Sequence, residues 1–319
     1  MIERIIEIAE EAARLHVRHA QLVIEREGCE PITTPLEELA ALVLAHPRAL
    51  LTSAVLCGLA EAGGTVVICD GKHLPSALFL PVQSHFVQTE RMARQAMMPA
   101  PLRKRLWQQV VRAKLRAQSR LLMELRGQDG GLAAMAPRVR SGDPSNVEAR
   151  GARIYWPMLF ADSGFRRDRD APNQNRHLNY GYAVLRALVA RAICAAGLHP
   201  SLGVCHYNRY NAFCLADDLL EPLRPLVDRA VVEWLAAHDP AAPLDAQTRA
   251  WLIQPSLAHY AVGSEVRSLF NVLAQVASSL ASVIMGEAED FDLPVLNSID
   301  ETAGRMPVEC AAAGGEDIA

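Results

Sequence analysis

The sequence predicts an α+β protein, with a small β-rich amino-terminal domain followed by a larger all-helical domain. Short alternating apolar runs are concentrated before residue 86, whereas apolar residues at helical spacing continue as far as residue 286. The end of the chain is acidic and rich in glycine and alanine, which is typical of a segment without a packed core. We therefore expect a β-rich domain at 1–85, a helical domain at 86–286 and an acidic flexible tail at 287–319.

Local patterns predict the elements of the β-rich domain. Alternating or turn-bounded apolar runs predict three strands, at residues 14–18, 21–25 and 64–70. A helix is expected around residues 53–62, and the opening residues fit either a strand or a helix. Residues 73–85, with two prolines, predict an extended connector to the helical domain.

The helical domain is predicted from apolar residues that recur every three or four positions. This spacing is clear in three stretches, at residues 102–115, 184–189 and 269–276. The glycine-rich run at 127–131 interrupts the pattern and predicts a break between helices.

Composition restricts the class of protein. Half of the 319 residues are apolar, enough for a sizeable core, but no stretch has the ~20 apolar residues that span a bilayer. Seven cysteines occur without a C-x-x-C pair, so neither a zinc knuckle nor a redox motif is indicated. An odd number of unpatterned cysteines is typical of a reducing compartment. We therefore expect a cytoplasmic protein without a membrane partner.

The charge is unevenly distributed, although the net charge is only −4. The segment 287–319 holds nine acidic residues and one basic residue, which leaves +4 for the rest of the chain. Residues 91–120 hold nine basic residues and no acidic one. Solvated helices usually mix both signs, because opposite charges pair along a helix. The basic run is therefore either a solvated helical face or a surface for DNA phosphates.

An apolar stretch at 205–222, CHYNRYNAFCLADDLLEP, gathers three acidic residues, Asp217, Asp218 and Glu221. Residues three or four apart share a helical face, so these carboxylates repel one another unless solvent or a cation balances them. A solvated acidic turn would explain them, but the surrounding leucines leave little polar face, and Pro222 interrupts the helix. His206 precedes the helix in a loop, and spacing alone does not place it beside Glu221.

A second segment of interest is SGDPSNVEARGARIYWPMLF at 141–160. Asp143 and Pro144 predict a helix start, with the aspartate as the cap and the proline in the first turn. Glu148 then falls within the first two turns, where a carboxylate complements the positive end of the helix dipole. This structural role alone would explain Glu148.

Three sequence blocks occur in order, NVEARGARIYW, LNYGYAVLRA and GVCHYNRYNAFCLADDLLEPLRPLVDR. Together they resemble the CRISPR adaptation integrases, the universal first CRISPR-associated protein that inserts new spacers, in its type II form. The similarity extends upstream through QLVIEREG, VVICDGKHLPSALFLP and LRKRLWQQVVRAKL, and covers residues 13–235. It implies a β-rich amino-terminal domain, a helical catalytic domain and a homodimer formed through the amino-terminal parts.

The resemblance also implies a site for a divalent metal. In the family the metal is held by the glutamate of the E-A-R-G-A-R block, the histidine of the third block and the second acid of a D-x-x-acid pair. The matching residues here are Glu148, His206 and Glu221. Asp218 is expected to support them, and Asp217 is a lesser candidate. Carboxylates and one imidazole suit Mg²⁺ or Mn²⁺ with open or water-filled positions, unlike the thiolate sites of zinc.

The implied reaction is a transesterification, in which a 3′-hydroxyl of a captured DNA fragment, the prespacer, attacks the repeat end of the CRISPR array. The implied partners are prespacer and repeat DNA, a small dimeric second adaptation protein and the type II effector nuclease. Two alternatives stay open. A metal-dependent nuclease for branched DNA would use the same residues, and a non-catalytic DNA-capture scaffold would require binding alone.

DNA contacts are expected mainly to the backbone, because an aromatic content of 5% is low for a base-stacking platform. The predicted phosphate-binding residues are Arg103, Lys104, Arg105, Arg112, Lys114, Arg150, Arg153, Arg166 and Arg167. The sequence departs from the family at Ala12 and Ala20, where turn glycines are common. Alanine resists positive φ, so the early hairpin is expected to close differently or less tightly.

Overall fold

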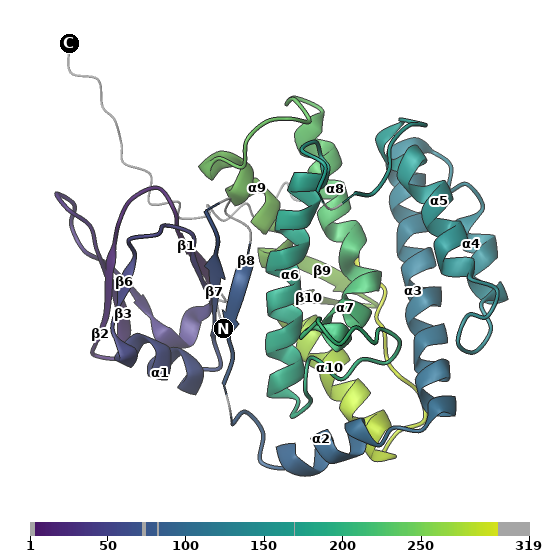
Figure 1. Cartoon of the computed structure of the whole chain (residues 1–319), viewed down its shortest axis with the longest axis horizontal. Helices are drawn as coiled ribbons and strands as arrows, with labels where there is room; N and C mark the ends of the chain where they lie inside the picture. The colour runs from purple at the N-terminus through teal and green to yellow at the C-terminus, as the bar shows by residue number, and fades with distance from the viewer. Residues whose placement is uncertain (1–3, 72–74, 82, 169, 299–319) are drawn as a thin grey trace.

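The computed structural model describes residues 4–71, 75–81, 83–168 and 170–298, and places a β-rich region beside a mostly helical one (Figure 1). Strands β1–β8 and one α-helix precede residue 80, and most of the later described residues are helical. The α+β class is therefore confirmed. The division into domains at residues 85 and 286 stays a prediction.

Two four-stranded sheets form the β-rich region. The first has the order β1-β5-β7-β8, and its strands are β1 (Arg4–Ile8), β5 (Leu39–Leu44), β7 (Thr65–Cys69) and β8 (Pro75–Phe79). The second has the order β4-β3-β2-β6, and its strands are β2 (Arg14–Arg18), β3 (Gln21–Glu25), β4 (Ile32–Pro35) and β6 (Leu50–Leu51). The short helix η1 (Leu36–Glu38) and α1 (Ser53–Glu61) complete the region. Strand β8 pairs antiparallel with β7, so part of the expected connector is a strand of the sheet.

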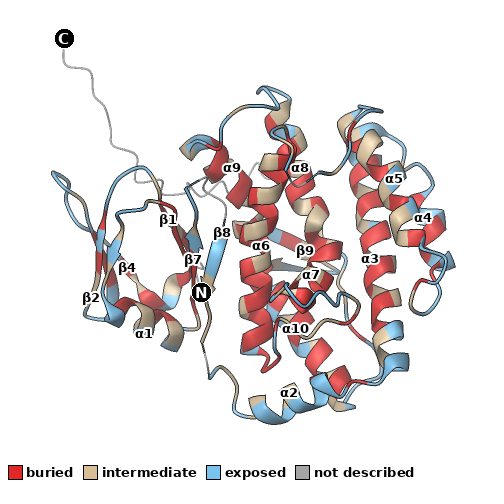
Figure 2. Cartoon of the chain, viewed as in Figure 1, coloured by how far each residue is buried: buried red, intermediate tan, exposed pale blue. Residues whose placement is uncertain are grey.

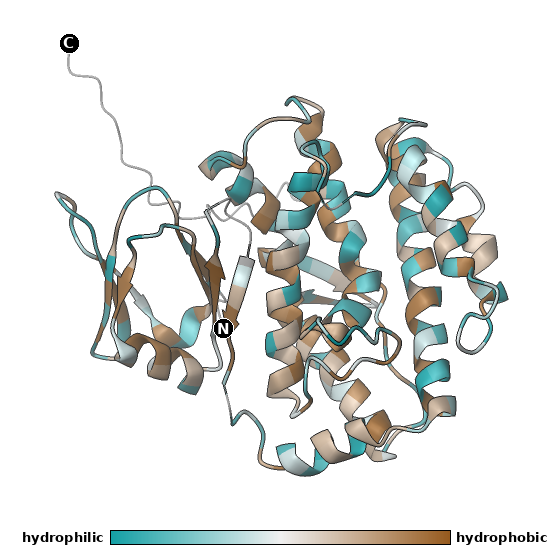
Figure 3. Ribbon diagram, viewed as in Figure 1, coloured by the Kyte–Doolittle hydropathy of each residue, from teal (hydrophilic) through white to brown (hydrophobic). Residues whose placement is uncertain are grey.

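The first sheet has a hydrophobic core on each of its faces. Leu42 and Leu44 of β5 pack in the core between the two sheets and α1, whereas Ala41 and Val43 belong to the core of the helical region. Such burial on both faces gives a nearly continuous apolar strand, as is usual for parallel sheets (Figures 2 and 3). The first sheet therefore separates two hydrophobic cores and contributes side chains to both.

The helical region is organised around α6, which contacts β7 and β8 as well as its helical neighbours. Its helices are α2 (Gln88–Ala96), α3 (Ala100–Arg126), α4 (Leu132–Met135), η2 (Ala136–Arg138), α5 (Val147–Phe160), α6 (Asn175–Ala195), α7 (Cys214–Leu220), η3 (Glu221–Leu223), α8 (Arg224–Leu235), α9 (Ala246–Leu257) and α10 (Leu269–Met285). Gly127, with φ of 71°, ends α3 at the expected break. Within the described ranges, no helix combines the length and the apolar character needed to cross a bilayer.

The expectation of an all-helical second region is wrong in one place. A three-stranded antiparallel sheet, in the order β10-β9-β11, consists of β9 (His259–Val262), β10 (Glu265–Ser268) and β11 (Asn297–Ser298). Its first two strands form a hairpin around Gly263, which has φ of 60°. Because each strand has at most four residues, the alternation is too short to be recognised beside the long helical pattern that follows.

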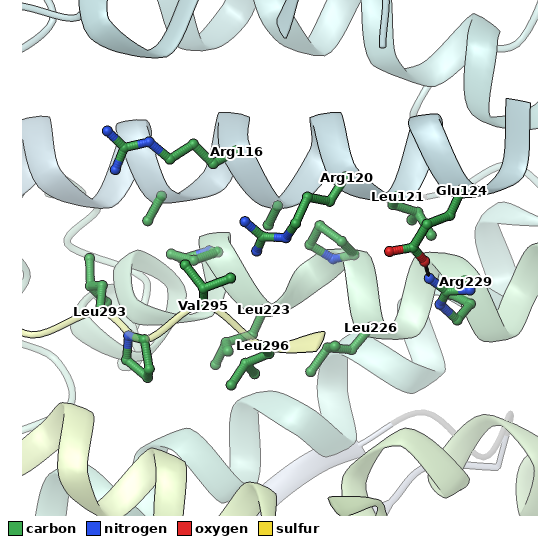
Figure 4. Close-up of a pocket in the computed structure, with 15 residues that line it drawn as sticks. Arg116, Arg120, Leu121, Glu124, Leu223, Leu226, Arg229, Leu293, Val295 and Leu296 are labelled. Atoms are coloured by element: carbon green, nitrogen blue, oxygen red, sulfur yellow. Dashed lines mark ion pairs between the residues drawn. The ribbon is translucent and has the colours of Figure 1, made fainter. Parts of the chain in front are cut away.

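The expectation of a flexible tail from residue 287 is also wrong for residues 287–298. Phe291 is buried, and Leu293 and Leu296 pack against the core of the helical region. The same segment lines a pocket between α3 and α8, below Arg116 and Arg120 (Figure 4). Apolar anchors therefore hold this part in place despite its acidic composition. The remainder of the expected tail, 299–319, lies outside the described residues.

A buried arginine links the helical region to the first strand. Arg249 of α9 is 1% exposed and pairs with Glu7 at 3.0 Å and with Glu10. Tyr180 of α6 donates a hydrogen bond of 3.0 Å to the same Glu7 carboxylate. A buried charge is tolerated where it is paired and hydrogen-bonded, so this cluster fixes how β1 meets α6 and α9.

The early hairpin closes tightly despite its alanine. Strand β2 pairs with β3 up to Arg18 opposite Gln21, which leaves a two-residue turn of His19 and Ala20. Both turn residues have positive φ, 52° and 58°. The expectation of a looser hairpin is therefore wrong, and Ala20 instead adopts a conformation that favours glycine.

We expect Ala20→Gly to stabilise the protein by about 0.5–1 kcal/mol, because glycine adopts positive φ without steric strain. The matched control is Ala12→Gly, since Ala12 has no positive φ and glycine there only adds freedom to the unfolded chain. Urea unfolding of the three proteins measures the difference. A stability of Ala20→Gly equal to that of Ala12→Gly would contradict the expectation.

Candidate active site

Lys114 of α3 lies between two carboxylates that come from other helices, Glu148 of α5 and Glu221 of η3. Its ammonium nitrogen contacts Glu148 Oε1 and lies 2.6 Å from Glu221 Oε2. Lys114 is only 7% exposed. Burial acts to lower the pKa of Lys114, but the charges of Glu221 and Glu148 outweigh it and raise this pKa. The lysine is therefore charged and shared by the two glutamates.

The start of α5 positions Glu148. The Asp143 carboxylate accepts hydrogen bonds from the backbone N–H groups of Val147 and Glu148, each at 2.9 Å. Asp143 therefore binds the first N–H groups of the helix, but the N-cap position is Asn146 rather than the expected Asp143. The helix begins at Val147, however, so Pro144 lies before it rather than in its first turn. Glu148 is consequently the second residue of the helix and lies in its first turn.

A glycine allows α5 to approach α3. Gly151 lies one turn after Glu148, and a Cβ atom there would be 2.4 Å from Leu115 Cδ2. A larger residue would therefore push the two helices apart. Because Leu115 follows Lys114 directly, the close packing also brings Glu148 within reach of the lysine.

Two cations surround the Glu221 carboxylate. Lys114 contacts Oε2, and Arg224 donates a hydrogen bond of 3.0 Å to Oε1. Glu221 is 7% exposed, and burial alone would raise its pKa. Arg224 and Lys114 outweigh that effect and lower the pKa of Glu221 to about 2. The break between α7 and α8 at Glu221–Leu223, caused by Pro222, turns this carboxylate toward α3.

Asp218 organises the loop that carries His206. Its fully buried carboxylate accepts hydrogen bonds from the backbone N–H groups of Val204, Cys205 and His206, at 2.6, 3.0 and 3.3 Å. It also lies 2.6 Å from His206 Nδ1, and this hydrogen bond is the main cause of the raised pKa of His206. With Nδ1 held in this way, Nε2 is the ring nitrogen available to a ligand.

The structure brings Glu148 and Glu221 together but does not join His206 to them directly. Trp107 packs its edge against the His206 ring, with 5.6 Å between centroids, and the charge of Glu221 contributes to the raised pKa of His206. Over the residues that are described, no three His, Cys, Asp or Glu side chains converge closely enough to hold a metal ion. Asp217 points elsewhere, with a hydrogen bond of 2.7 Å from Asn211 and Arg186 at 3.9 Å.

Four of the predicted phosphate-binding residues contact other groups of the protein. Lys114 is buried between the glutamates, so it is not part of an exposed basic surface. Arg112 donates to the carbonyl oxygen of Val139 at 2.8 Å, and Arg167 donates to Asn179 Oδ1 at 2.6 Å. The guanidinium of Arg103 stacks over the Tyr207 ring at 5.2 Å. The remaining predicted residues are exposed: Lys104, Arg105, Arg150, Arg153 and Arg166. Two of them, Arg153 and Arg166, also donate to nearby backbone carbonyl oxygens.

A buried aspartate behind the site ties three helices together. Asp228 of α8 accepts hydrogen bonds from the hydroxyls of Tyr155, at 2.6 Å, and Tyr182. Tyr155 lies two turns after Glu148 on α5, and α8 follows directly after the turn that carries Glu221. The cluster therefore fixes the distance between the two helical segments that supply the carboxylates.

A family model described as CRISPR associated protein Cas1 matches residues 6–242. The chain belongs to this family. The Cas1 protein of Neisseria meningitidis serogroup C (strain 8013), named a CRISPR-associated endonuclease, is 36% identical over 301 residues, which cover 92% of this chain and 97% of that protein. A second Cas1 endonuclease, from Pyrobaculum aerophilum, is 27% identical over 242 residues, which cover 72% of this chain and 81% of that protein. The resemblance found in the sequence blocks is thereby confirmed.

Solved structures of low identity have the same fold. A casposase bound to its integration product superposes with a TM-score of 0.74 at 20% identity, covering 91% of this chain and 92% of that one. A Cas1 protein from Thermotoga maritima superposes with a TM-score of 0.69 at 16% identity, covering 89% and 97%. A Cas6-RT-Cas1–Cas2 complex superposes with a TM-score of 0.70 at 18% identity, covering 90% of this chain and 35% of that one.

Proposed function

We propose that this Cas1 protein is a divalent-metal-dependent DNA integrase and endonuclease of CRISPR adaptation. It joins the 3′-hydroxyl ends of prespacers to the repeat array by transesterification, and it cleaves DNA when water replaces the hydroxyl. The observation that carries the proposal is the convergence of Glu148 and Glu221, from two helices, on one buried cation. A buried carboxylate such as that of Glu221 repels a neighbouring carboxylate such as that of Glu148 unless a positive charge lies between them.

The chemistry of Glu148, Glu221 and His206 suits a Mg²⁺ or Mn²⁺ ion, and His206 would have to move toward the two glutamates to join them. Glu148 and Glu221 already stabilise a cation between them, and His206 offers Nε2 because Asp218 engages Nδ1. These three residues would hold the ion. When bound, it would supply Lewis-acid stabilisation of charge on the attacking and leaving oxygens of the phosphodiester.

The chain's own groups perform the remaining tasks. Asp218 holds the loop that carries His206 and orients the imidazole ring. The Asp228 cluster holds α5 and α8 at a fixed separation. Exposed bases such as Arg150 and Arg153, which follow Glu148 on α5, would contact the DNA backbone beside the reacting phosphate. Catalysis would then depend chiefly on positioning the phosphodiester against a fixed cluster of charge.

The partners follow from the relatives. The similar structures include a casposase bound to its integration product, a complex of Cas1 with DNA and a complex that contains Cas2. They support prespacer and repeat DNA, and a small dimeric second adaptation protein, as partners of this chain. We also propose a homodimer through the β-rich region, and the type II effector nuclease as a further partner.

The experiment that tests the function uses the full-length protein and a branched DNA that mimics a half-inserted prespacer, with Mn²⁺ or with EDTA. We expect rejoined strands of defined length in Mn²⁺ and none in EDTA. Cleaved strands without rejoining would instead indicate a branched-DNA nuclease. Retention of the DNA without any change to its strands, equal in both buffers, would indicate a scaffold and overturn the proposal.

A further inference from the structure

The position of Lys114 is unusual for a lysine. On α3 it belongs to the buried stripe that contains Val110, Val111, Leu115 and Gln118, at the spacing of residues that face a core. Its ammonium group contacts the Glu148 and Glu221 carboxylates. A buried lysine at such a position has a role that an apolar residue could not fill.

We propose that Lys114 is the resident counter-ion of the metal site: its ammonium group pairs with Glu148 and Glu221 when no divalent ion is bound, and a divalent ion must displace it. The inference rests on the proposed function, since it assumes that these two carboxylates are metal ligands. It makes Lys114 a positioning residue, which keeps both side chains pointing at one place before the metal arrives.

Geometry and charge support the displacement. The oxygen atoms that face each other across the site, Glu148 Oε1 and Glu221 Oε2, are the atoms that the ammonium group contacts. An ammonium ion and a divalent ion cannot share them without strong repulsion in a poorly hydrated environment. Glu221 Oε1 is also engaged by Arg224, so Oε2 is its atom that a new cation would take. The flexible four-carbon stem of lysine lets the ammonium group withdraw without moving α3.

The consequence is that Lys114 weakens metal binding while it stabilises the metal-free protein. Removing its charge leaves the buried Glu221 carboxylate facing the partly exposed Glu148 carboxylate with fewer balancing cations. This destabilises the metal-free state and strengthens binding of any divalent cation. A residue that merely oriented the ligands would act in the opposite direction, because its loss would weaken metal binding.

The test measures Mn²⁺ affinity directly by electron paramagnetic resonance of free Mn²⁺, on the full-length protein without DNA, for the wild type, Lys114→Gln and Lys114→Met. We expect both variants to bind Mn²⁺ at least about tenfold more tightly than the wild type, a difference of 1.4 kcal/mol. In EDTA their Tm should be lower, by about 5 °C or more, and Mn²⁺ should raise their Tm by more than it raises that of the wild type.

The matched control is Arg229→Gln. Arg229 also lies between two glutamates, Glu124 and Glu233, but all three side chains are at least a quarter exposed. Its loss should leave Mn²⁺ affinity unchanged, because solvent screens an exposed charge. Lys114→Arg, which retains the charge, should bind Mn²⁺ no more tightly than the wild type.

The outcomes separate this inference from the function on which it rests. If the wild type binds Mn²⁺ and the uncharged Lys114 variants bind it equally or less tightly, Lys114 is not a displaced counter-ion, although the metal site stands. If neither the wild type nor any variant binds Mn²⁺, both proposals are wrong. Tighter binding by Lys114→Gln or Lys114→Met but not by Arg229→Gln supports the inference.

Discussion

Replacing Glu221 with glutamine is expected to reduce strand joining on the branched DNA by about 10³-fold or more, because it removes one of two charged ligands of the proposed ion. The same change leaves Lys114 and Arg224 without their shared carboxylate. Uncompensated buried charge costs about 3–5 kcal/mol, so the variant should also be less stable. Joining is therefore measured at a temperature where circular dichroism shows that the variant is folded.

The stability loss has a characteristic pH dependence. The pKa of Glu221 is about 2 in the folded protein, below the ordinary value of 4.5, so its carboxylate stabilises the fold above pH 4.5. This contribution disappears as the pH falls from 4.5 toward 2. The difference in unfolding free energy between the wild type and Glu221→Gln should therefore be complete at pH 7 and shrink in acid.

Glu233→Gln is the control for these measurements. Glu233 is a half-exposed acid on α8, and its pairing with Arg229 at 3.7 Å lies at the surface. This variant should join strands at the wild-type rate and lose little stability. A Glu221→Gln protein that is folded and joins strands as fast as Glu233→Gln would show that Glu221 is not a ligand needed for the reaction.

The strands at 14–18 and 21–25, the strand within 64–70 and the helix near 53–62 could be predicted closely because each is determined by its own residues. Alternation over five residues, or a helix-spaced run between turn residues, is a local signal. Strand β8 is different, since the two prolines of residues 73–85 suggest a connector and only pairing with β7 makes β8 a strand. Residues 287–298 show the same limit, because their acidic composition conceals apolar anchors such as Phe291 and Leu293.

The candidate site was predictable to the extent that its residues lie in recognisable blocks. Glu148, His206 and Glu221 were identified through the family resemblance, whereas the local pattern around Glu148 is explained by the helix dipole alone. The sequence predicts a basic surface that includes Lys114, because Lys114 is one of nine bases in residues 91–120. Its helical spacing from Val110 and Val111 is a signal for burial, but only the packing of α3, α5 and η3 identifies its partners.

Replacing Asp228 with alanine is expected to destabilise the protein by about 3–5 kcal/mol. The change leaves the buried hydroxyls of Tyr155 and Tyr182 without their acceptor and opens a cavity between α5, α6 and α8. Asp228→Asn keeps the volume and one acceptor, so about 1–2 kcal/mol is expected for it. Urea unfolding at pH 7 measures both, and equal stabilities for alanine and asparagine would contradict a hydrogen-bonding role.

The pH dependence of the stability of Asp228→Asn is a second test of the Asp228 cluster. Burial raises the pKa of Asp228 to about 6, against an ordinary value of 3.8, although the tyrosine hydroxyls and Arg224 act to lower it. The folded protein therefore holds an extra proton between these values, and the stability gained from it is lost as the pH rises through 6. Relative to the wild type, Asp228→Asn should become more stable between pH 4 and pH 7. The cap residue Asp245, whose pKa is lowered by its hydrogen bonds to Thr248, provides the opposite case, since Asp245→Asn should lose relative stability as the pH rises.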